Sequence, residues 1–142
     1  AAAENIIPTV THSPQVVQEI LPQLAGKIDG MALNVPVPDG SNVDLVTLMK
    51  RPVTAEEVNE IVKSASLTTF KRIVEYTDQP IVSSDVVGND HSAVFDGLST
   101  FVLGGNMLKT ITWYDNGWGY ATRVVELIGR LASLHVAPGT GR

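Results

Sequence analysis

An acid, an amide and two glycines stand together within residues 113–120, directly before a stretch with the spacing of an amphipathic helix. Asp115 and Asn116 are residue types that begin helices, because their side-chain oxygens accept backbone N–H groups that the first turn leaves unpaired. An exposed amide at a helix start can also hydrogen-bond a ligand. The residues alone therefore leave two interpretations open for Asn116, a capped strand-to-helix junction and a ligand contact.

Apolar periodicity predicts three helices, over residues 14–24, from the capping sequence at residues 54–57, and over residues 116–134. Alternating apolar residues predict strands over residues 31–37, 42–50, 81–87, 93–97, 100–103 and 107–114, whereas residues 71–76 are ambiguous. A turn signal at residues 39–41 favours antiparallel pairing of the first two strands. This order indicates an α+β fold, with a mostly antiparallel or mixed sheet and helices on one face.

A chain of 142 residues is long enough to bury a core as one domain. We divide it into a sheet-and-helix portion over residues 1–114, a C-terminal helix over residues 115–134 and a flexible tail over residues 135–142. No run of 18 apolar residues occurs, so no membrane span is expected, and the first residues lack the pattern of a secretory signal.

Composition excludes several kinds of site. A net charge of −5, with ten scattered basic residues, argues against nucleic acid as a partner. The absence of cysteine excludes disulfides, thiolate metal sites and a cysteine nucleophile within this chain. The three histidines are far apart in sequence and no carboxylate pair has metal-ligand spacing, so no metal site is expected.

Four groups of residues, taken in order, resemble the C-terminal part of phosphorylating glyceraldehyde-3-phosphate dehydrogenase. They are residues 5–11, residues 30–36, residues 82–85 with 91–96, and residues 113–120 with 123–125. The resemblance covers residues 1–136 without obvious insertions. It implies the fold of that family's catalytic domain, which is tetrameric through its sheets. It also implies that the C-terminal helix docks on a nucleotide-binding domain that this chain lacks.

In that family, a cysteine thiolate activated by a histidine attacks the aldehyde, hydride passes to NAD, and inorganic phosphate opens the resulting thioester. Both residues lie upstream of the matched region, so the resemblance assigns no catalytic residue to this chain and implies that the chain alone is inactive. The implied cofactor is NAD, with NADP as an alternative, because the ribose-reading residues lie in the nucleotide-binding half. The implied partners are an aldehyde phosphate, inorganic phosphate and that half, in a cytoplasmic homotetramer.

Several site residues follow from the resemblance. Asn116 matches the asparagine that hydrogen-bonds the nicotinamide carboxamide. Tyr120 matches a tyrosine near the nicotinamide, although packing alone is an alternative role. Thr11 matches the threonine that donates to the attacking phosphate, and its alternative role is that of a turn residue before Pro14.

Three positions depart from the family pattern. His12 replaces a glycine whose N–H binds phosphate; it adds a donor, narrows the pocket, or is an exposed loop residue. Asn34 stands where the family usually carries an arginine that clamps phosphate, and it offers a neutral amide in place of that charge. Gly117 replaces an acidic residue near the nicotinamide.

These departures leave alternatives to the leading expectation, which is oxidation of glyceraldehyde 3-phosphate to 1,3-bisphosphoglycerate in glycolysis. One is an erythrose-4-phosphate dehydrogenase. Another is a non-catalytic interaction module that kept the fold, which Asn34 and the missing cysteine favour. Because the apolar side of the C-terminal helix would stay wet in this chain alone, we also expect self-association or pairing with a separate chain.

Overall fold

The computed structural model of the chain describes residues 4–135. Backbone contacts divide the chain into two compact units, Ala1–Pro38 and Asp39–Arg142. The chain combines helices with an antiparallel and a mixed sheet, which makes it an α+β fold, as the sequence predicts. The division at residue 114 stays a prediction, and residues 136–142 of the predicted tail lie outside the described residues.

The first unit is a short two-stranded ladder whose strands are separated in sequence by a helix. Strand β1 (Ile7–Thr9) pairs antiparallel with β2 (Ala32–Asn34), and α1 (Ser13–Ile20) and the 3-10 helix η1 (Pro22–Leu24) lie between them in sequence. The single helix predicted over residues 14–24 is wrong at its end. Because proline lacks an N–H and disfavours helical geometry in the residue before it, Pro22 breaks the helix after Ile20.

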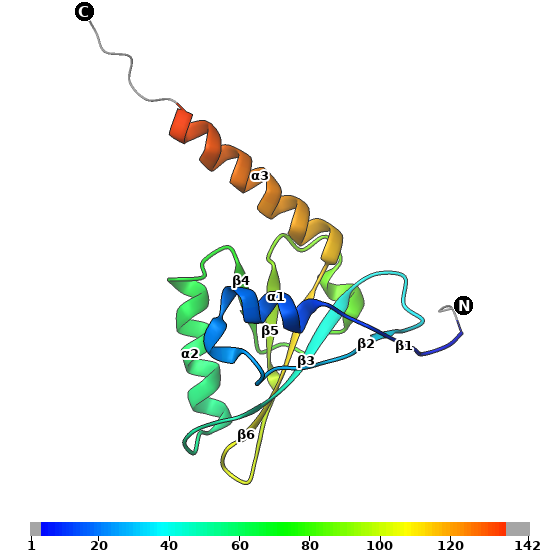
Figure 1. The fold of residues 1–142 in the computed structure, drawn as a ribbon, viewed down its shortest axis with the longest axis vertical. Helices are drawn as coiled ribbons and strands as arrows, with labels where there is room; N and C mark the ends of the chain where they lie inside the picture. The colour runs from blue at the N-terminus through cyan, green and yellow to red at the C-terminus, as the bar shows by residue number, and fades with distance from the viewer. Residues whose placement is uncertain (1–3, 136–142) are drawn as a thin grey trace, which may run out of the picture. The chain divides into compact units, whose positions relative to one another are not determined.

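The second unit contains a four-stranded sheet (Figure 1). Its strands are β3 (Ser41–Leu48), β4 (Val74–Thr77), β5 (Ala93–Leu103) and β6 (Met107–Tyr114), in the order β3-β6-β5-β4. β6 is antiparallel to both of its neighbours, whereas β4 is parallel to β5. The ambiguous residues 71–76 therefore lead into a parallel edge strand.

The predicted pairing of residues 31–37 with residues 42–50 is wrong. β2 pairs with β1, and β3 pairs with β6 over its full length, from Ser41 opposite Tyr114 to Leu48 opposite Met107. The predicted first strand is also too long, because Pro36 has no N–H to give to a ladder. A three-residue strand offers β3 far fewer ladder hydrogen bonds than the eight-residue β6 does.

Two further strand predictions are corrected. Residues 81–87 contain no strand but the 3-10 helix η2 (Ser83–Val86), which begins where the carboxylate of Asp85 accepts the N–H of Val82 at 2.7 Å. The strands predicted over 93–97 and 100–103 form one strand, β5, with an irregular register between Asp96 and Phe101. The buried Asp96 carboxylate accepts the N–H groups of two residues in this bulge, at 3.0 and 3.1 Å.

Helix α2 (Ala55–Leu67) covers β4 and β5. It begins as the capping sequence predicts, with Thr54 Oγ1 accepting the N–H of Glu57 at 3.2 Å. The side chain of Asn59 donates to the carbonyl of Gly97 at 2.8 Å and so ties the helix to β5. In the second unit, the buried apolar side chains are Val53, Val86, Val94, Phe95 and Leu108.

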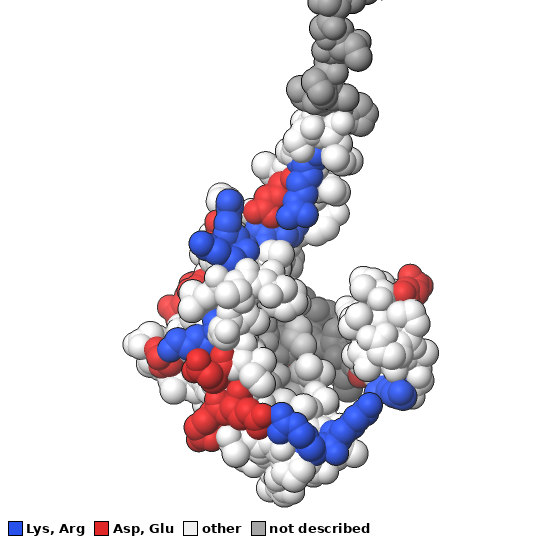
Figure 2. All heavy atoms as spheres, turned by 90° about the vertical axis from the view of Figure 1, so that its left-hand side faces the viewer, with Lys and Arg blue, Asp and Glu red and all other residues white. Residues whose placement is uncertain are grey.

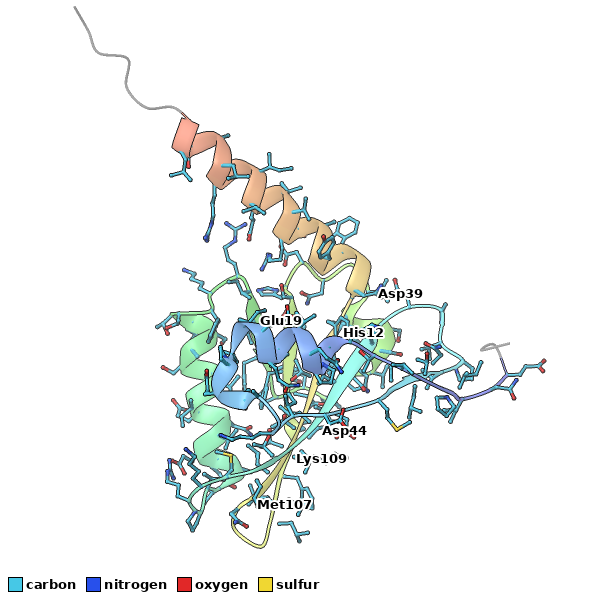
Figure 3. All side chains as sticks on the ribbon, viewed as in Figure 1. His12, Glu19, Asp39, Asp44, Met107 and Lys109 are labelled. Carbon is cyan, nitrogen blue, oxygen red and sulfur yellow. The ribbon has the colours of Figure 1, made fainter. Side chains whose placement is uncertain are left out.

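The strands β3 and β6 carry exposed apolar side chains, among them Leu45 and Val46 of β3. An ion pair joins the two strands, with Lys109 Nζ 2.9 Å from Asp44 Oδ2 (Figure 3). On the face in Figure 2, basic side chains are interspersed with acidic ones. Among residues 4–135, no helix combines the length and apolar character that crossing a membrane requires.

Helix α3 (Asn116–His135) follows β6 after one residue and extends beyond the end of the sheet (Figure 1). Its range agrees with the predicted helix over residues 116–134 to within one residue. Many of its hydrophobic side chains are exposed; those more than half exposed are Trp118, Tyr120, Val125, Leu127, Ile128 and Leu134.

Candidate nicotinamide and phosphate contacts

Asp115 is the residue that caps α3. It is only 6% exposed, and its Oδ1 accepts the N–H groups of Gly117 and Trp118 at 2.9 and 2.8 Å. Its Oδ2 accepts the N–H of Gly88 at 2.9 Å, from the loop after η2. Hydrogen bonds from these three N–H groups favour the ionised carboxylate and lower the pKa of Asp115 below its ordinary value of 3.8. The largest contribution comes from the N–H of Gly88.

With Asp115 as the cap, the amide of Asn116 is left for another use. Asn116 is the first residue of α3 and is exposed. Its side chain makes no hydrogen bond with any other residue of the described range 4–135. Asp115 therefore supplies the cap, and Asn116 presents its amide to solvent, while a ligand contact by Asn116 stays a prediction.

Tyr120 lies one turn after Asn116, so the two side chains are neighbours on the helix surface. Tyr120 is 73% exposed, which leaves little support for the packing role within this chain. Between them in sequence, Gly119 is buried against the loop before β5, where a Cβ would lie 2.9 Å from the carbonyl oxygen of His91. The structure therefore brings the two predicted cofactor residues together at the start of α3.

Arg123 also contributes to this region, although the sequence alone assigns it no role. Its Nη1 donates to the carbonyl of Arg72 at 2.8 Å, and its Nη2 donates to the carbonyl of Asp90 at 3.2 Å. The signal available in the sequence was its spacing: Arg123 follows Asn116 by seven residues, two helical turns, and so lies on the same side of α3.

Thr11 forms a turn directly before α1, whose N-cap residue is His12. Thr11 Oγ1 accepts the N–H of Ser13 at 3.2 Å, and its hydroxyl donates to Ser13 Oγ at 3.0 Å. This is the turn role that the sequence left as the alternative, although a hydroxyl can rotate to a new partner. His12 is exposed and makes no capping hydrogen bond. His12 and Glu19 stand at opposite ends of α1 (Figure 3).

Asn34 ends β2 opposite Ile7 and is exposed. Within residues 4–135 its side chain has no hydrogen-bond partner. Thr9, which leads to Thr11, pairs at the other end of the same ladder. Thr11 and His12 are therefore adjacent, whereas Asn34 is separated from them by the length of the ladder.

No group of three or more His, Asp or Glu side chains able to hold a metal ion occurs in the described part of the chain. His91 has neighbours typical of a structural role. Its Nδ1 lies 3.0 Å from Asn89 Oδ1 and 3.4 Å from Glu75 Oε2, and Asn89 in turn donates to Glu75 at 2.8 Å. This cluster holds together the loop that precedes β5.

Comparison with known proteins gives a consistent result. The family model described as glyceraldehyde 3-phosphate dehydrogenase, C-terminal domain, matches residues 1–116. Glyceraldehyde-3-phosphate dehydrogenase 2 of Bacillus subtilis is 50% identical over 133 residues, which are 94% of this chain and 39% of the relative. Glyceraldehyde-3-phosphate dehydrogenase of Borreliella burgdorferi is 51% identical over 133 residues, 92% of this chain and 40% of the relative. The chain spans about two fifths of the length of these curated relatives.

Proposed function

Because this chain belongs to the family of the glyceraldehyde 3-phosphate dehydrogenase C-terminal domain, we propose that it forms the catalytic-domain part of an NAD-dependent phosphorylating dehydrogenase. The reaction is oxidation of glyceraldehyde 3-phosphate to 1,3-bisphosphoglycerate, in glycolysis. The observation that carries the proposal within this chain is the exposed amide of Asn116, left without a partner because Asp115 caps the helix.

The amide of Asn116 suits the carboxamide of nicotinamide. An amide side chain offers two donors and a carbonyl acceptor, and a carboxamide offers the complementary set, so two hydrogen bonds can form side by side. Such a pair fixes the rotation of the carboxamide and, with it, the ring face turned toward the aldehyde. When bound, NAD accepts the hydride that leaves the aldehyde carbon. The contribution of this chain is orientation, which can supply several kcal/mol of rate acceleration.

The apolar side of α3 is the surface that we assign to the nucleotide-binding half. Ile128 is 60% exposed, and Leu131 is half exposed one turn later. Burying each such side chain contributes about 1.5–3 kcal/mol, so covering several of them suffices for stable docking. The exposed apolar strands around Leu45 and Val46 are the surfaces that we assign to contacts between subunits of a tetramer.

The phosphate contacts are assigned to the first unit. Thr11 would turn its hydroxyl from Ser13 to inorganic phosphate, and the N–H of His12 would supply a second donor. Asn34 would meet the substrate phosphate with an uncharged amide. A guanidinium would add a positive charge and a second, parallel N–H···O bond to the phosphate, so we expect the neutral amide of Asn34 to bind the aldehyde phosphate more weakly than an arginine would.

The experiment is a rapid-mixing assay of the protein expressed from its complete reading frame, with glyceraldehyde 3-phosphate or erythrose 4-phosphate and with NAD or NADP. Asn116→Ala should slow the burst of reduced cofactor by about tenfold to a hundredfold, as expected for a misplaced reactant. Asn106→Ala serves as the control, because Asn106 lies in the β5–β6 turn and is likewise exposed. Inactivity with all four combinations would rule out the enzyme and favour the interaction module.

A second variant tests the substrate phosphate. Asn34→Arg places a guanidinium on the exposed end of β2, and it should lower the KM for the aldehyde phosphate by about tenfold with little change in kcat. Lys27→Arg is the matched control, because it introduces a guanidinium elsewhere in the first unit and adds no charge. An unchanged KM in Asn34→Arg would separate Asn34 from the phosphate site.

A further inference from the structure

The guanidinium of Arg123 connects α3 to the segments that lead into β4 and β5. Arg123 donates to the carbonyl of Arg72 at 2.8 Å and to that of Asp90 at 3.2 Å. Arg72 stands two residues before β4, and Asp90 stands three residues before β5. Because β4 and β5 are parallel, their N-terminal ends lie at the same end of the sheet. Arg123 therefore attaches α3 to that end of the sheet through two backbone carbonyls, whose positions are set by the strands that follow them.

The guanidinium itself is held in place. Arg123 Nη2 donates to Glu126 Oε1 at 3.3 Å, and Nε lies 3.2 Å from Glu126 Oε2, although this N–H does not point at the oxygen. Glu126 Oε1 also lies 3.5 Å from the guanidinium of Arg72. The planar fork of a guanidinium presents donors in fixed directions from three nitrogens and so reaches two carbonyls and a carboxylate at once, whereas the donors of a lysine all lie on one nitrogen.

Arg123 lies on the same side of α3 as Asn116, so its contacts affect how Asn116 is oriented. Asn116, Gly119 and Arg123 follow one another at three and four residues, so they share one side of α3. Asp115 fixes the start of the helix, and Arg123 fixes it again two turns later, about 10 Å along the axis. One anchor leaves a helix free to rotate about its axis, whereas two anchors on one side fix the direction in which Asn116 projects.

We propose that Arg123 is a positioning residue for Asn116: it sets the rotation of α3 so that the amide already faces the nicotinamide when the cofactor binds. This inference rests on the function proposed above. Arg123 touches neither cofactor nor substrate and acts only through the helix. The carbonyls of Arg72 and Asp90 hold the guanidinium of Arg123 in place, and this fixes the orientation of the first two turns of α3.

The test is a double-mutant cycle in the protein expressed from its complete reading frame, with Arg123→Gln, Asn116→Ala and both together. Arg123→Gln should slow the burst of reduced cofactor by about tenfold, because a shift of about 1 Å is enough for such a loss. The Kd for NAD should change by less than about threefold, since a positioning residue affects the transition state more than binding. The double variant should be no slower than Asn116→Ala alone, because both changes remove the same interaction.

Two further variants exclude a merely structural effect. Arg130→Gln removes the same charge from an exposed position on the same helix and should leave the burst unchanged. Arg123→Lys keeps the charge and loses the fork, so its burst should be nearly as slow as that of Arg123→Gln, and it replaces Arg123→Gln in the cycle if that variant does not fold.

The outcomes separate the inference from the function on which it rests. Losses that multiply in the double variant, or an equal loss in Arg130→Gln, would overturn the role of Arg123. A slow Asn116→Ala beside a normal Arg123→Gln would overturn it too and leave the proposed function standing. An Asn116→Ala variant with a normal burst would instead remove the proposed function.

Discussion

The carboxylate of Asp115 joins the first turn of α3 to the N–H of Gly88, which lies 27 residues earlier in the chain, at 2.9 Å. One oxygen caps the helix and the other holds the loop, so a single buried side chain connects two segments that are distant in sequence. Because Asp115 already caps the helix, the amide of the neighbouring Asn116 is not needed there and can face solvent.

Replacing Asp115 with asparagine should separate the two roles. An amide has only one acceptor oxygen, so it can satisfy the two N–H groups of the helix or the one of Gly88, and its NH2 group faces the remaining donor. Because the cap contributes two hydrogen bonds, we expect the amide of Gly88 to lose its protection from hydrogen exchange. The amides of Gly117 and Trp118 should keep theirs. Equal loss at all three amides would contradict this assignment.

The lowered pKa of Asp115 predicts how stability depends on pH. A carboxyl whose pKa is lower in the folded than in the unfolded state stabilises the fold above the unfolded value of 3.8. That stabilisation is lost as the pH falls through the folded value. The difference in unfolding free energy between the wild type and Asp115→Asn should therefore be constant at neutral pH and should shrink below 3.8. Urea denaturation across the acid range measures it, and a difference that persists at the lowest pH would exclude the ionised carboxylate as the cause.

The sequence predicts the starts of α2 and α3 and the bounds of β6 well, because the signals that decide them are local. Capping residues precede α2 and α3, and two glycines at 104 and 105 adopt the positive φ angles of the β5–β6 turn. Pairing partners are not local. The turn signal at residues 39–41 favoured the wrong neighbour for β3, because β6, more than 60 residues later, offers a full-length ladder.

The candidate site shows the same limit. The residue types at 115 and 116 predict both a cap and a ligand contact, and only the structure assigns the cap to Asp115. The spacing of Arg123 from Asn116 places both on one side of α3, but the sequence does not show what Arg123 binds there, because two of its partners are the backbone carbonyls of Arg72 and Asp90. A carbonyl is present at every residue and leaves no mark in the sequence.

Two glycines of α3 predict opposite effects of the same substitution. A Cβ at Gly119 would lie 2.9 Å from the carbonyl oxygen of His91, whereas a Cβ at Gly129 meets nothing within 4 Å. Gly119→Ala should lower the unfolding free energy by about 1–3 kcal/mol, because neither backbone can give way easily. Gly129→Ala should raise it by about 0.5–1 kcal/mol through helix propensity. Thermal unfolding compares the two, and a neutral Gly119→Ala would mean that the helix does not pack closely on this loop.

Arg72 has a φ of 67°, the one positive φ among the non-glycine residues of the described chain. A side chain in this left-handed region costs about 1–2 kcal/mol, which glycine avoids. Both Arg72→Ala and Arg72→Gly lose the ion pair with Glu126, so that loss cancels between them. After allowance for the greater freedom of glycine in the unfolded chain, Arg72→Gly should be more stable than Arg72→Ala by up to about 1 kcal/mol.

Arg51 provides the matched control for Arg72. It lies in an irregular segment and also forms an ion pair, with Glu57, but its φ is not positive. At Arg51 the order should reverse, and the alanine variant should be the more stable one, because alanine restricts the unfolded chain without strain in the folded one. Urea denaturation of the four variants gives both differences. If glycine were favoured equally at both positions, the cause would not be the left-handed backbone of Arg72, and the carbonyl that Arg123 engages would owe nothing to that conformation.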